Sequence, residues 1–231
     1  MKNTYLLLVS TLLITLYACD DDYNSQPIDV TYDTLPFEDI RLETSSDVRI
    51  IQANYFQVII SGPQTDVNNT NVFVDQGQLV IDEFGHHADN EVIRIYVPVF
   101  NQLESTGSSN VYGESQFHQN GNMELILSGS GEIDMYVDAD NLDAYLSGSG
   151  AIYLEGQMDN VDYHLSGSGW VHAFNLFTDF TDVRITGSGS AEVTVDNDLD
   201  VNISGSGDVF YKGHPFINTQ ISGSGHVIDA N

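Results

Sequence analysis

The stretch Leu146-Ser147-Gly148-Ser149-Gly150-Ala151-Ile152 contains the tetrapeptide that decides the fold of this chain. The Ser-Gly-Ser-Gly motif, or a close variant, begins at Thr106, Ser128, Ser147, Ser166, Thr186, Ser204 and Ser222. Successive starts lie 22, 19, 19, 20, 18 and 18 residues apart. Self-similarity at this period is typical of a solenoid, in which each repeat buries its apolar face against its neighbours. We therefore expect a single-domain solenoid with about seven such corners.

Apolar and polar residues alternate on both sides of every corner. The residue before the corner is aliphatic in each complete repeat: Leu127, Leu146, Leu165, Ile185, Ile203 and Ile221. A second apolar row begins after the corners: Val111, Ile133, Ile152, Val171, Ala191, Val209 and Val227. A period of two predicts β-strands that bury one face. We therefore expect an all-β, parallel, β-helix-like solenoid, right-handed and with almost no helix.

The corner residues have a structural explanation. A sharp turn between two sheets needs a positive φ or a close approach of two backbones, and glycine accepts both. The serines of one corner can hydrogen-bond to the equivalent serines one coil away. The motif matches neither a Gly-x-Ser-x-Gly nucleophile elbow nor a phosphate-binding loop, so we interpret it as scaffold.

Residues 36–105 show the same alternation less regularly than residues 106–231. Their strand-like runs are Val48–Ile51, Phe56–Ile60, Val72–Val74, Leu79–Ile81 and Val92–Val97. We expect irregular, broader coils that continue the solenoid and cover its N-terminal end, where apolar core and unpaired strand edges must be shielded. The head domain is thus predicted to span residues 36–231.

The N-terminus carries the features of an export signal. An apolar run from Tyr5 to Tyr17 is too short for a permanent membrane span. It leads into Leu16-Tyr17-Ala18-Cys19, which resembles the lipobox of bacterial lipoproteins and contains the only cysteine of the chain. The resemblance implies a signal peptide over residues 1–18 and a lipid on the Cys19 sulfur, through which the protein meets a membrane. The alternative is an ordinary signal peptide with an incidental cysteine.

Three acidic residues, Asp20, Asp21 and Asp22, follow the cysteine. They resemble the signal that sends some Gram-negative lipoproteins to the outer face of the outer membrane, which implies a surface-exposed protein of the cell envelope. In other lineages an aspartate directly after the cysteine implies retention at the inner membrane. Residues 19–35 lack a clear period and are predicted to form an acidic tether.

The charge balance excludes one class of partner. The chain has 34 acidic and 6 basic residues, which gives a formal net charge of −28 at pH 7. Such a surface repels phosphates, so we expect no nucleic-acid partner. The simplest role of the charge is solubility and resistance to aggregation.

Several sequence features together resemble a known family. They are Phe37-x-x-Ile40, the strand at Val48–Ile51, the strand at Gly77–Ile81 and the run of Ser-Gly-Ser-Gly corners. They look like the family called putative auto-transporter adhesin, head GIN domain, over residues 36–231. The resemblance implies a β-solenoid on a secreted or lipid-anchored protein, with adhesion as the proposed role.

One column of carboxylates lies four residues before the corners: Glu124, Asp143, Asp162, Asp182 and Asp200. The flanking apolar rows force these side chains outward, where like charges stacked at strand spacing destabilise one another and could attract a cation such as calcium. Against this, a flat sheet offers no loop of convergent oxygens, and known calcium-loop patterns are absent. The pair His86-His87 also lacks a metal ligand at useful spacing. We therefore predict no metal site and no cofactor, and interpret the column as a solvated acidic face.

Two sets of outward residues are candidates for ligand binding. Tyr145, His164 and Arg184 share an outward row beside the acidic column. Trp170, the only tryptophan, lies in another outward row directly after a corner. Exposed aromatic residues anchor interfaces, so these four residues are the predicted binding surface.

Each coil ends in a variable segment that leads back to the next coil, which we call the return. In the longest internal coil after the first, this segment contains three phenylalanines: Phe174, Phe177 and Phe180. We expect this return to fold over and bury them. The alternative is an exposed aromatic patch for a ligand or partner.

These observations favour a non-catalytic protein of the cell envelope that presents a β-solenoid for adhesion or for binding an extracellular glycan or protein. One alternative is a polysaccharide-active enzyme on a β-helix, whose site would gather carboxylates, or a carboxylate with Arg or Lys, on one sheet. The basic residues available for such a site after the signal peptide are Arg41, Arg49, Arg94, Arg184 and Lys212. The other alternative is a structural envelope protein that associates through the ends of its solenoid.

Overall fold

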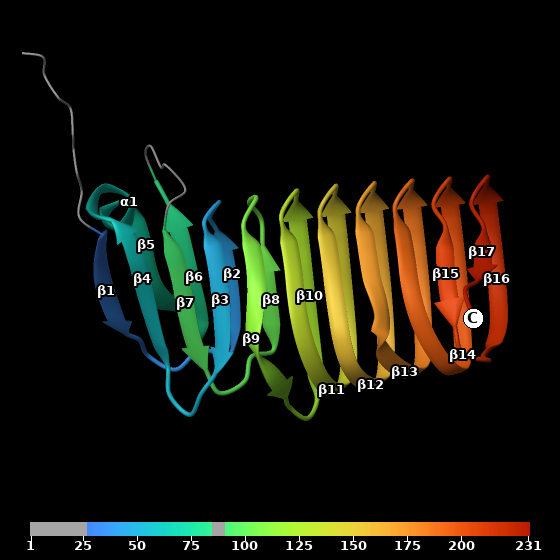
Figure 1. Cartoon of the computed structure of the whole chain (residues 1–231), viewed down its shortest axis with the longest axis horizontal. Helices are drawn as coiled ribbons and strands as arrows, with labels where there is room; N and C mark the ends of the chain where they lie inside the picture. The colour runs from blue at the N-terminus through green and yellow to red at the C-terminus, as the bar shows by residue number, and fades with distance from the viewer. Residues whose placement is uncertain (1–26, 85–90) are drawn as a thin grey trace, which may run out of the picture.

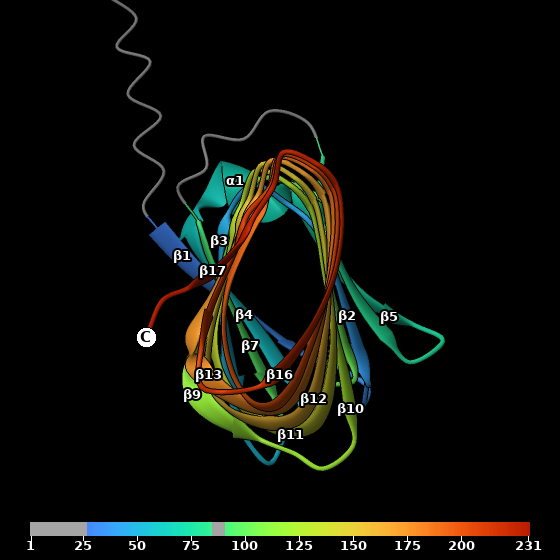
Figure 2. The same ribbon diagram turned by 90° about the vertical axis from the view of Figure 1, so that its right-hand side faces the viewer.

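The computed structural model describes residues 27–84 and 91–231. They form one elongated β-solenoid whose coils lie side by side along the long axis (Figure 1). Seen along that axis, successive coils superpose as a narrow oval with two long sides (Figure 2). In the described parts of the chain, the only α-helix is the five-residue α1 (Gln64–Asn68). The prediction of an all-β parallel solenoid with about seven turns is confirmed.

The regular part of the rod is built from strands that alternate between the two long sides. These strands are β9 (Asn110–His118), β10 (Asn122–Gly129), β11 (Glu132–Gly148), β12 (Ala151–Gly167), β13 (Trp170–Gly187), β14 (Ser190–Gly205), β15 (Val209–Lys212), β16 (Phe216–Gly223) and β17 (Val227–Asp229). Neighbouring coils pair in parallel, so that Leu146 lies beside Leu165 and Ile152 beside Val171. We call the side whose strands lead into the corners the entry face, and the side whose strands leave the corners the exit face.

The first coils do not follow the order of the sequence. β2 (Asp39–Glu43) pairs with both β6 (Gln78–Glu83) and β8 (Gln102–Ser105). β3 (Asp47–Gln52) likewise pairs with both β7 (Val92–Val97) and β9. The coil made by β2 and β3 therefore lies between two coils that come later in the chain. Residues 36–105 continue the solenoid as predicted, but strand alternation does not reveal this interleaved order.

Antiparallel strands close the N-terminal end of the rod. β1 (Pro27–Asp33) pairs with β4 (Gln57–Pro63), which in turn pairs with β7. β5 (Thr70–Asp75) forms a hairpin with β6 that projects from the coils (Figure 2). The irregular N-terminal part of the predicted fold is confirmed, although the antiparallel pairing of these strands was not predicted. The prediction of a tether through residue 35 is wrong for β1. Ile28, Val30 and Tyr32 alternate at the strand period and pack against the core, which explains why this segment joins the sheet.

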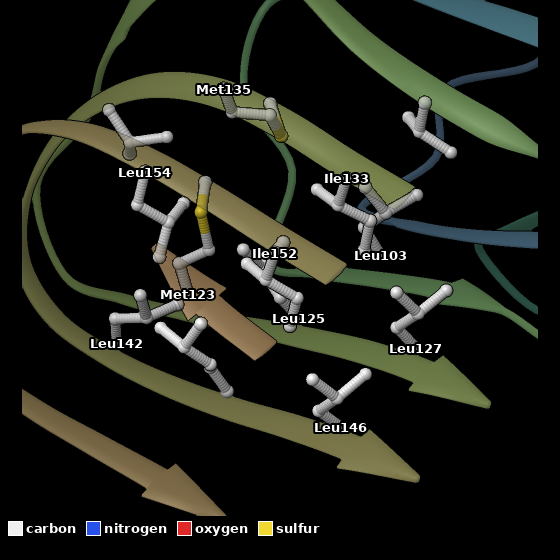
Figure 3. Close-up of a cluster of buried hydrophobic side chains, with 14 of the residues drawn as sticks. Leu103, Met123, Leu125, Leu127, Ile133, Met135, Leu142, Leu146, Ile152 and Leu154 are labelled. Atoms are coloured by element: carbon white, nitrogen blue, oxygen red, sulfur yellow. The ribbon is translucent and has the colours of Figure 1, made fainter. Parts of the chain in front are cut away.

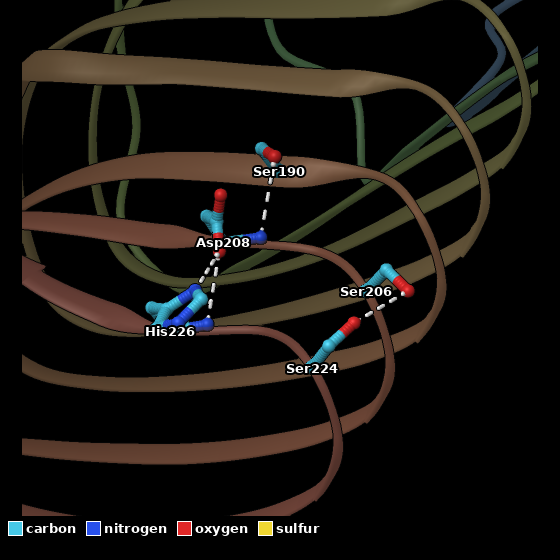
Figure 4. A network of polar contacts seen from close by, with 5 residues as sticks. All are labelled: Ser190, Ser206, Asp208, Ser224 and His226. Atoms are coloured by element: carbon cyan, nitrogen blue, oxygen red, sulfur yellow. Dashed lines mark hydrogen bonds and ion pairs between the residues drawn. The ribbon is translucent and has the colours of Figure 1, made fainter.

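Glycine is required at the corners for two reasons. Gly148, the first glycine of its corner, has a φ of +123°, which side chains disfavour. Gly150, the second glycine, lies so close to the preceding coil that a Cβ atom there would be 2.4 Å from the carbonyl oxygen of Gly131. The expected serine ladder occurs between the last two corners, where Ser224 Oγ donates to Ser206 Oγ at 3.1 Å (Figure 4). These constraints arise because similar corners stack on one another.

The inward rows form one continuous apolar core. Figure 3 shows part of it, where Leu125 and Leu127 from the entry face lie near Ile133 and Ile152 from the exit face. Tyr163 is unusual in this core, because it is only 1% exposed and its hydroxyl group has no hydrogen-bond partner. Burial raises the pKa of this hydroxyl. The Tyr163 hydroxyl is thus a buried polar group that the fold does not satisfy with a protein partner.

Candidate functional site

The five predicted carboxylates stack in register on the entry face. Glu124 pairs with Asp143 between β10 and β11, and the row continues coil by coil to Asp200. Asn218 on β16 ends it. We call the five carboxylates, Glu124, Asp143, Asp162, Asp182 and Asp200, the acidic ladder.

One member of the acidic ladder has a cationic partner. Arg184 Nη2 lies 2.5 Å from Asp182 Oδ2. Burial raises the pKa of Asp182, Arg184 opposes this increase, and the charges of Asp162 and Asp200 add to it. Within residues 27–84 and 91–231, no group of three or more His, Cys, Asp or Glu side chains is placed to hold a metal ion. In the acidic ladder, like charges lie next to one another on an open sheet and repel.

Three of the four predicted binding residues lie together beside the acidic ladder. Tyr145, His164 and Arg184 occupy equivalent positions on β11, β12 and β13. The rings of Tyr145 and His164 stack with centroids 4.7 Å apart and planes at 8°. Arg184 Nη1 lies 3.5 Å from His164 Nε2. We call these three residues the entry-face stripe.

Trp170 lies on the exit face and is therefore separate from the entry-face stripe. It is 37% exposed, and its ring centroid lies 5.3 Å from that of His172 and 6.2 Å from that of Phe210. His172 stacks in turn on Tyr153 at 4.7 Å. The planes of each pair lie within 15° of one another. We call Tyr153, Trp170, His172 and Phe210 the exit-face stripe; the predicted surface is thus divided between two faces.

A bulge in β13 lies next to the exit-face stripe. Tyr153 pairs with His172, but Glu155 pairs with Asn175, so β13 has one more residue than β12 over this interval. The excess of residues in β13 over β14 is larger. Ala173 and Phe177 are four positions apart, but they pair with the adjacent residues Val193 and Thr194. The bulge breaks the alternation that an unbroken strand would show.

The expectation that the return buries its phenylalanines is wrong. Phe177 is 56% exposed and Phe180 is 44% exposed, while Phe174 is half-buried. Leu176 takes the inward position instead. The rings of Phe177 and Phe180 therefore lie on the outer surface of the solenoid.

The bulge forms one wall of an open hollow of about 330 Å³ on the exit face. Lys212 Nζ lies 4.1 Å from the centroid of the Phe174 ring and forms no ion pair with any of the described residues. Glu192 Oε2 lies 2.8 Å from His172 Nδ1. The residues that line the hollow are Tyr153, Leu154, Glu155, His172, Phe174, Asn175, Glu192 and Lys212. The hollow therefore combines aromatic surface with both hydrogen-bond donors and hydrogen-bond acceptors.

Sequence analysis missed most of this hollow. Tyr153, His172 and Phe210 share an outward row two residues after that of Trp170, so their clustering could have been found from the repeat alignment. The position of Lys212 over Phe174 depends on the bulge, which a period of two does not reveal.

Several predictions concern residues outside the described ranges. They include the signal peptide, Cys19, Asp20, Asp21, Asp22 and the pair His86-His87. In the described ranges, no helix has the length and hydrophobicity needed to cross a bilayer.

The fold and its two stripes define a class of protein: an acidic β-solenoid head with open side faces. The chain belongs to the family described as putative auto-transporter adhesin, head GIN domain, whose model matches residues 36–215. The family resemblance inferred from the corner motif is therefore confirmed.

Solved structures from Bacteroides and Parabacteroides species have the same fold. A putative adhesin from Bacteroides fragilis is 22% identical, with a TM-score of 0.84 over 88% of this chain and 97% of its own. A putative lipid binding protein from Parabacteroides distasonis is 22% identical, with a TM-score of 0.72 over 90% and 98% of the two chains. A putative adhesin from Parabacteroides merdae is 20% identical, with a TM-score of 0.65 over 90% and 98%. No curated protein matches this chain at a significant level.

Proposed function

We propose that this protein is a surface-exposed lipoprotein of the Gram-negative outer membrane that binds an extracellular glycan or protein for adhesion, without catalysis. Its lipid anchor is Cys19, its export signal is Asp20 to Asp22, and its solenoid is the binding head. The membership of an adhesin family supports this role.

The observation that carries the proposal is the exit-face stripe. Its four rings are packed against one another on an open strand surface, although polar residues there would cost nothing in core packing. Partly exposed aromatic clusters supply large contact area at low entropic cost and mark binding surfaces. Exposed aromatic rings lower solubility, so the solubility that a net charge of −28 provides does not account for this cluster.

The enzyme alternative has weaker support. A second open hollow, of about 510 Å³, lies at the return and is lined by His118, Asp138, Asp140 and Asp159 among others. Two of its three carboxylates hydrogen-bond to the backbone of a neighbouring coil: Asp138 Oδ1 accepts from the Gln157 amide at 2.9 Å, and Asp140 Oδ2 accepts from the Gly121 amide at 2.7 Å. These hydrogen bonds give Asp138 and Asp140 a structural role.

The test is an array of glycans and extracellular-matrix proteins probed with the purified protein, with and without calcium. We expect reproducible binding that Trp170→Ala abolishes. Arg184→Ala is the matched variant on the entry face. If this variant loses binding while Trp170→Ala keeps it, the binding surface lies on the entry face. The absence of any ligand under both conditions would contradict adhesion.

The lipoprotein part of the proposal has a separate test. Cys19→Ala should release the protein from the membrane fraction, because no thiol remains to carry the lipid. Unchanged fractionation of this variant would contradict the anchor.

A second candidate function is association through the end of the solenoid. Phe216 is 84% exposed on β16, and the inward-row residues Ile217 and Ile221 are exposed as well. β16 pairs only with β14, so its other edge is unpaired among the described strands. Sedimentation at increasing concentration tests this candidate, which predicts self-association that Ile221→Lys abolishes.

A further inference from the structure

The hollow beside the bulge of β13 has the chemistry of a sugar subsite. We propose that it binds a neutral glycan, a chain of uncharged hexose or N-acetylhexosamine units. This inference rests on the proposed function and names its ligand. The volume of about 330 Å³ lies at the lower end of the range of roughly 300–1,000 Å³ for small-molecule sites.

The bulge creates the shape of the subsite. The extra residues of β13 relative to β14 begin after Ala173, and Phe174 and Asn175 stand on the outward side while Leu176 remains in the core. The carbonyl oxygen of Phe174 accepts a hydrogen bond from Thr194 Oγ1 at 2.9 Å, which ties the bulge to β14. The wall is therefore built into the fold and does not depend on a ligand.

The apolar surface of the subsite is aromatic. Tyr153 and His172 stack with planes at 13°, and Trp170 continues this stack at 14° to His172. The face of an aromatic ring carries partial negative charge, which attracts the electropositive C–H groups that a pyranose presents on one side. Within the stack the rings cover part of one another's faces, so a pyranose can stack only on the ring faces that these pairs leave open.

The polar groups of the subsite match hydroxyl groups, which both donate and accept. Glu155 and Glu192 are acceptors at its rim, each already held by one neighbour: Asn175 Nδ2 donates to Glu155 at 3.1 Å, and His172 contacts Glu192. Lys212 supplies donors, since its ammonium group rests on the Phe174 ring and not on a carboxylate. Carboxylate acceptors and an ammonium donor beside the same aromatic rings can orient a sugar that carries no charge of its own.

The charge of the site selects against acidic ligands. Glu155 and Glu192 line a hollow that contains a single lysine, on a protein with a net charge of −28. Carboxylate or sulfate groups of an acidic glycan would meet like charges there, which discriminates against them. Neutral sugars avoid this repulsion and still use all the hydrogen-bonding groups.

The experiment is titration of the purified protein with neutral array hits, followed by three variants. Tyr153→Ala removes one aromatic ring from the subsite. Lys212→Met removes the ammonium donors but keeps an unbranched side chain of similar length. We expect each to weaken binding by about tenfold or more, which is the loss of one good contact. Tyr55→Ala, an exposed tyrosine outside both stripes, is the matched control and should bind normally. Unchanged thermal unfolding establishes that the variants are folded.

The outcomes separate this inference from the proposed function. Glycan binding that both Tyr153→Ala and Lys212→Met retain at full strength would overturn the subsite and leave adhesion intact. A preference for sialylated or sulfated glycans, or binding to proteins only, would overturn the neutral-glycan assignment in the same way. Complete absence of ligands would overturn both.

Discussion

Tyr163 places a phenol ring in an inward column whose other members are small or aliphatic. Its neighbours in register are Ala144 on the preceding coil and Val183 on the next. The small side chain of Ala144 leaves room for the ring, so the apolar part of Tyr163 fills the core well. Its hydroxyl group, however, is buried without a partner, and such a group costs about 1–3 kcal/mol.

We therefore expect Tyr163→Phe to stabilise the protein by about 1 kcal/mol, because the substitution removes the unsatisfied hydroxyl and keeps the ring. The midpoint of denaturant unfolding measures the change. Tyr145→Phe is the matched control on the surface and should shift the midpoint little. A clear loss of stability in Tyr163→Phe would mean that the hydroxyl is satisfied, for example by a buried water.

At the level of the element, the corner is the unit that the sequence predicted best. The repeat gives the positions of the strands, the inward rows and the acidic ladder, since all of them follow from a period of two and a fixed distance to the corner. The structure confirms that the ladder of Glu124 to Asp200 lies in register. The bulge at Phe174 departs from that period, so the hollow beside it was missed. The antiparallel β1 was missed because its short alternating run lies next to a polar segment.

Stacked corners make the second glycine more sensitive than an ordinary strand glycine. A Cβ atom at residue 150 would meet the backbone oxygen of Gly131 at 2.4 Å, and neither backbone can move without separating the coils. We expect Gly150→Ala to destabilise the protein by about 2 kcal/mol or more. Gly113→Ala is the control, because its Cβ would mainly meet the flexible Met135 side chain at 3.2 Å. Thermal unfolding compares the two, and equal losses would contradict the stacking argument.

For the whole molecule, charge is the feature that determines how stability depends on pH and salt. Burial raises the pKa of Asp39, and the charges of Glu38 and Glu124 raise it further. Burial also raises the pKa of Asp134, with Glu155 and Glu132 contributing. In the unfolded chain these carboxyl groups ionise at their ordinary, lower pKa. The ionised carboxyl groups therefore destabilise the folded state at pH values above their raised pKa values. This penalty is absent at pH values below the ordinary pKa.

The sign of the pH dependence follows. As pH falls from 7 through the raised pKa values, the folded state takes up more protons than the unfolded state, so the melting temperature should rise on mild acidification. Asp134→Asn should raise the melting temperature at pH 7, and this effect should fade as the pH falls through the raised pKa of the carboxyl group. Added salt should stabilise the protein at pH 7 by screening a net charge of −28. Scanning calorimetry across pH and salt measures all three, and a melting temperature that falls on mild acidification would contradict this account.

The interleaved first coils have a consequence for how the molecule can be assembled. β2 pairs on one side with β6 and on the other with β8, so the earliest part of the head cannot complete its hydrogen bonds until residues as far as 102–105 are present. Closing such long loops before contacts form is slow. The regular coils after residue 106, by contrast, each pair with the coil just before them and can grow by addition of one neighbour at a time. A chain synthesised from its N-terminus would thus have its first strands still without partners. Assembly would run from the later coils toward the N-terminal end, and β2 and β3 would complete their pairing last.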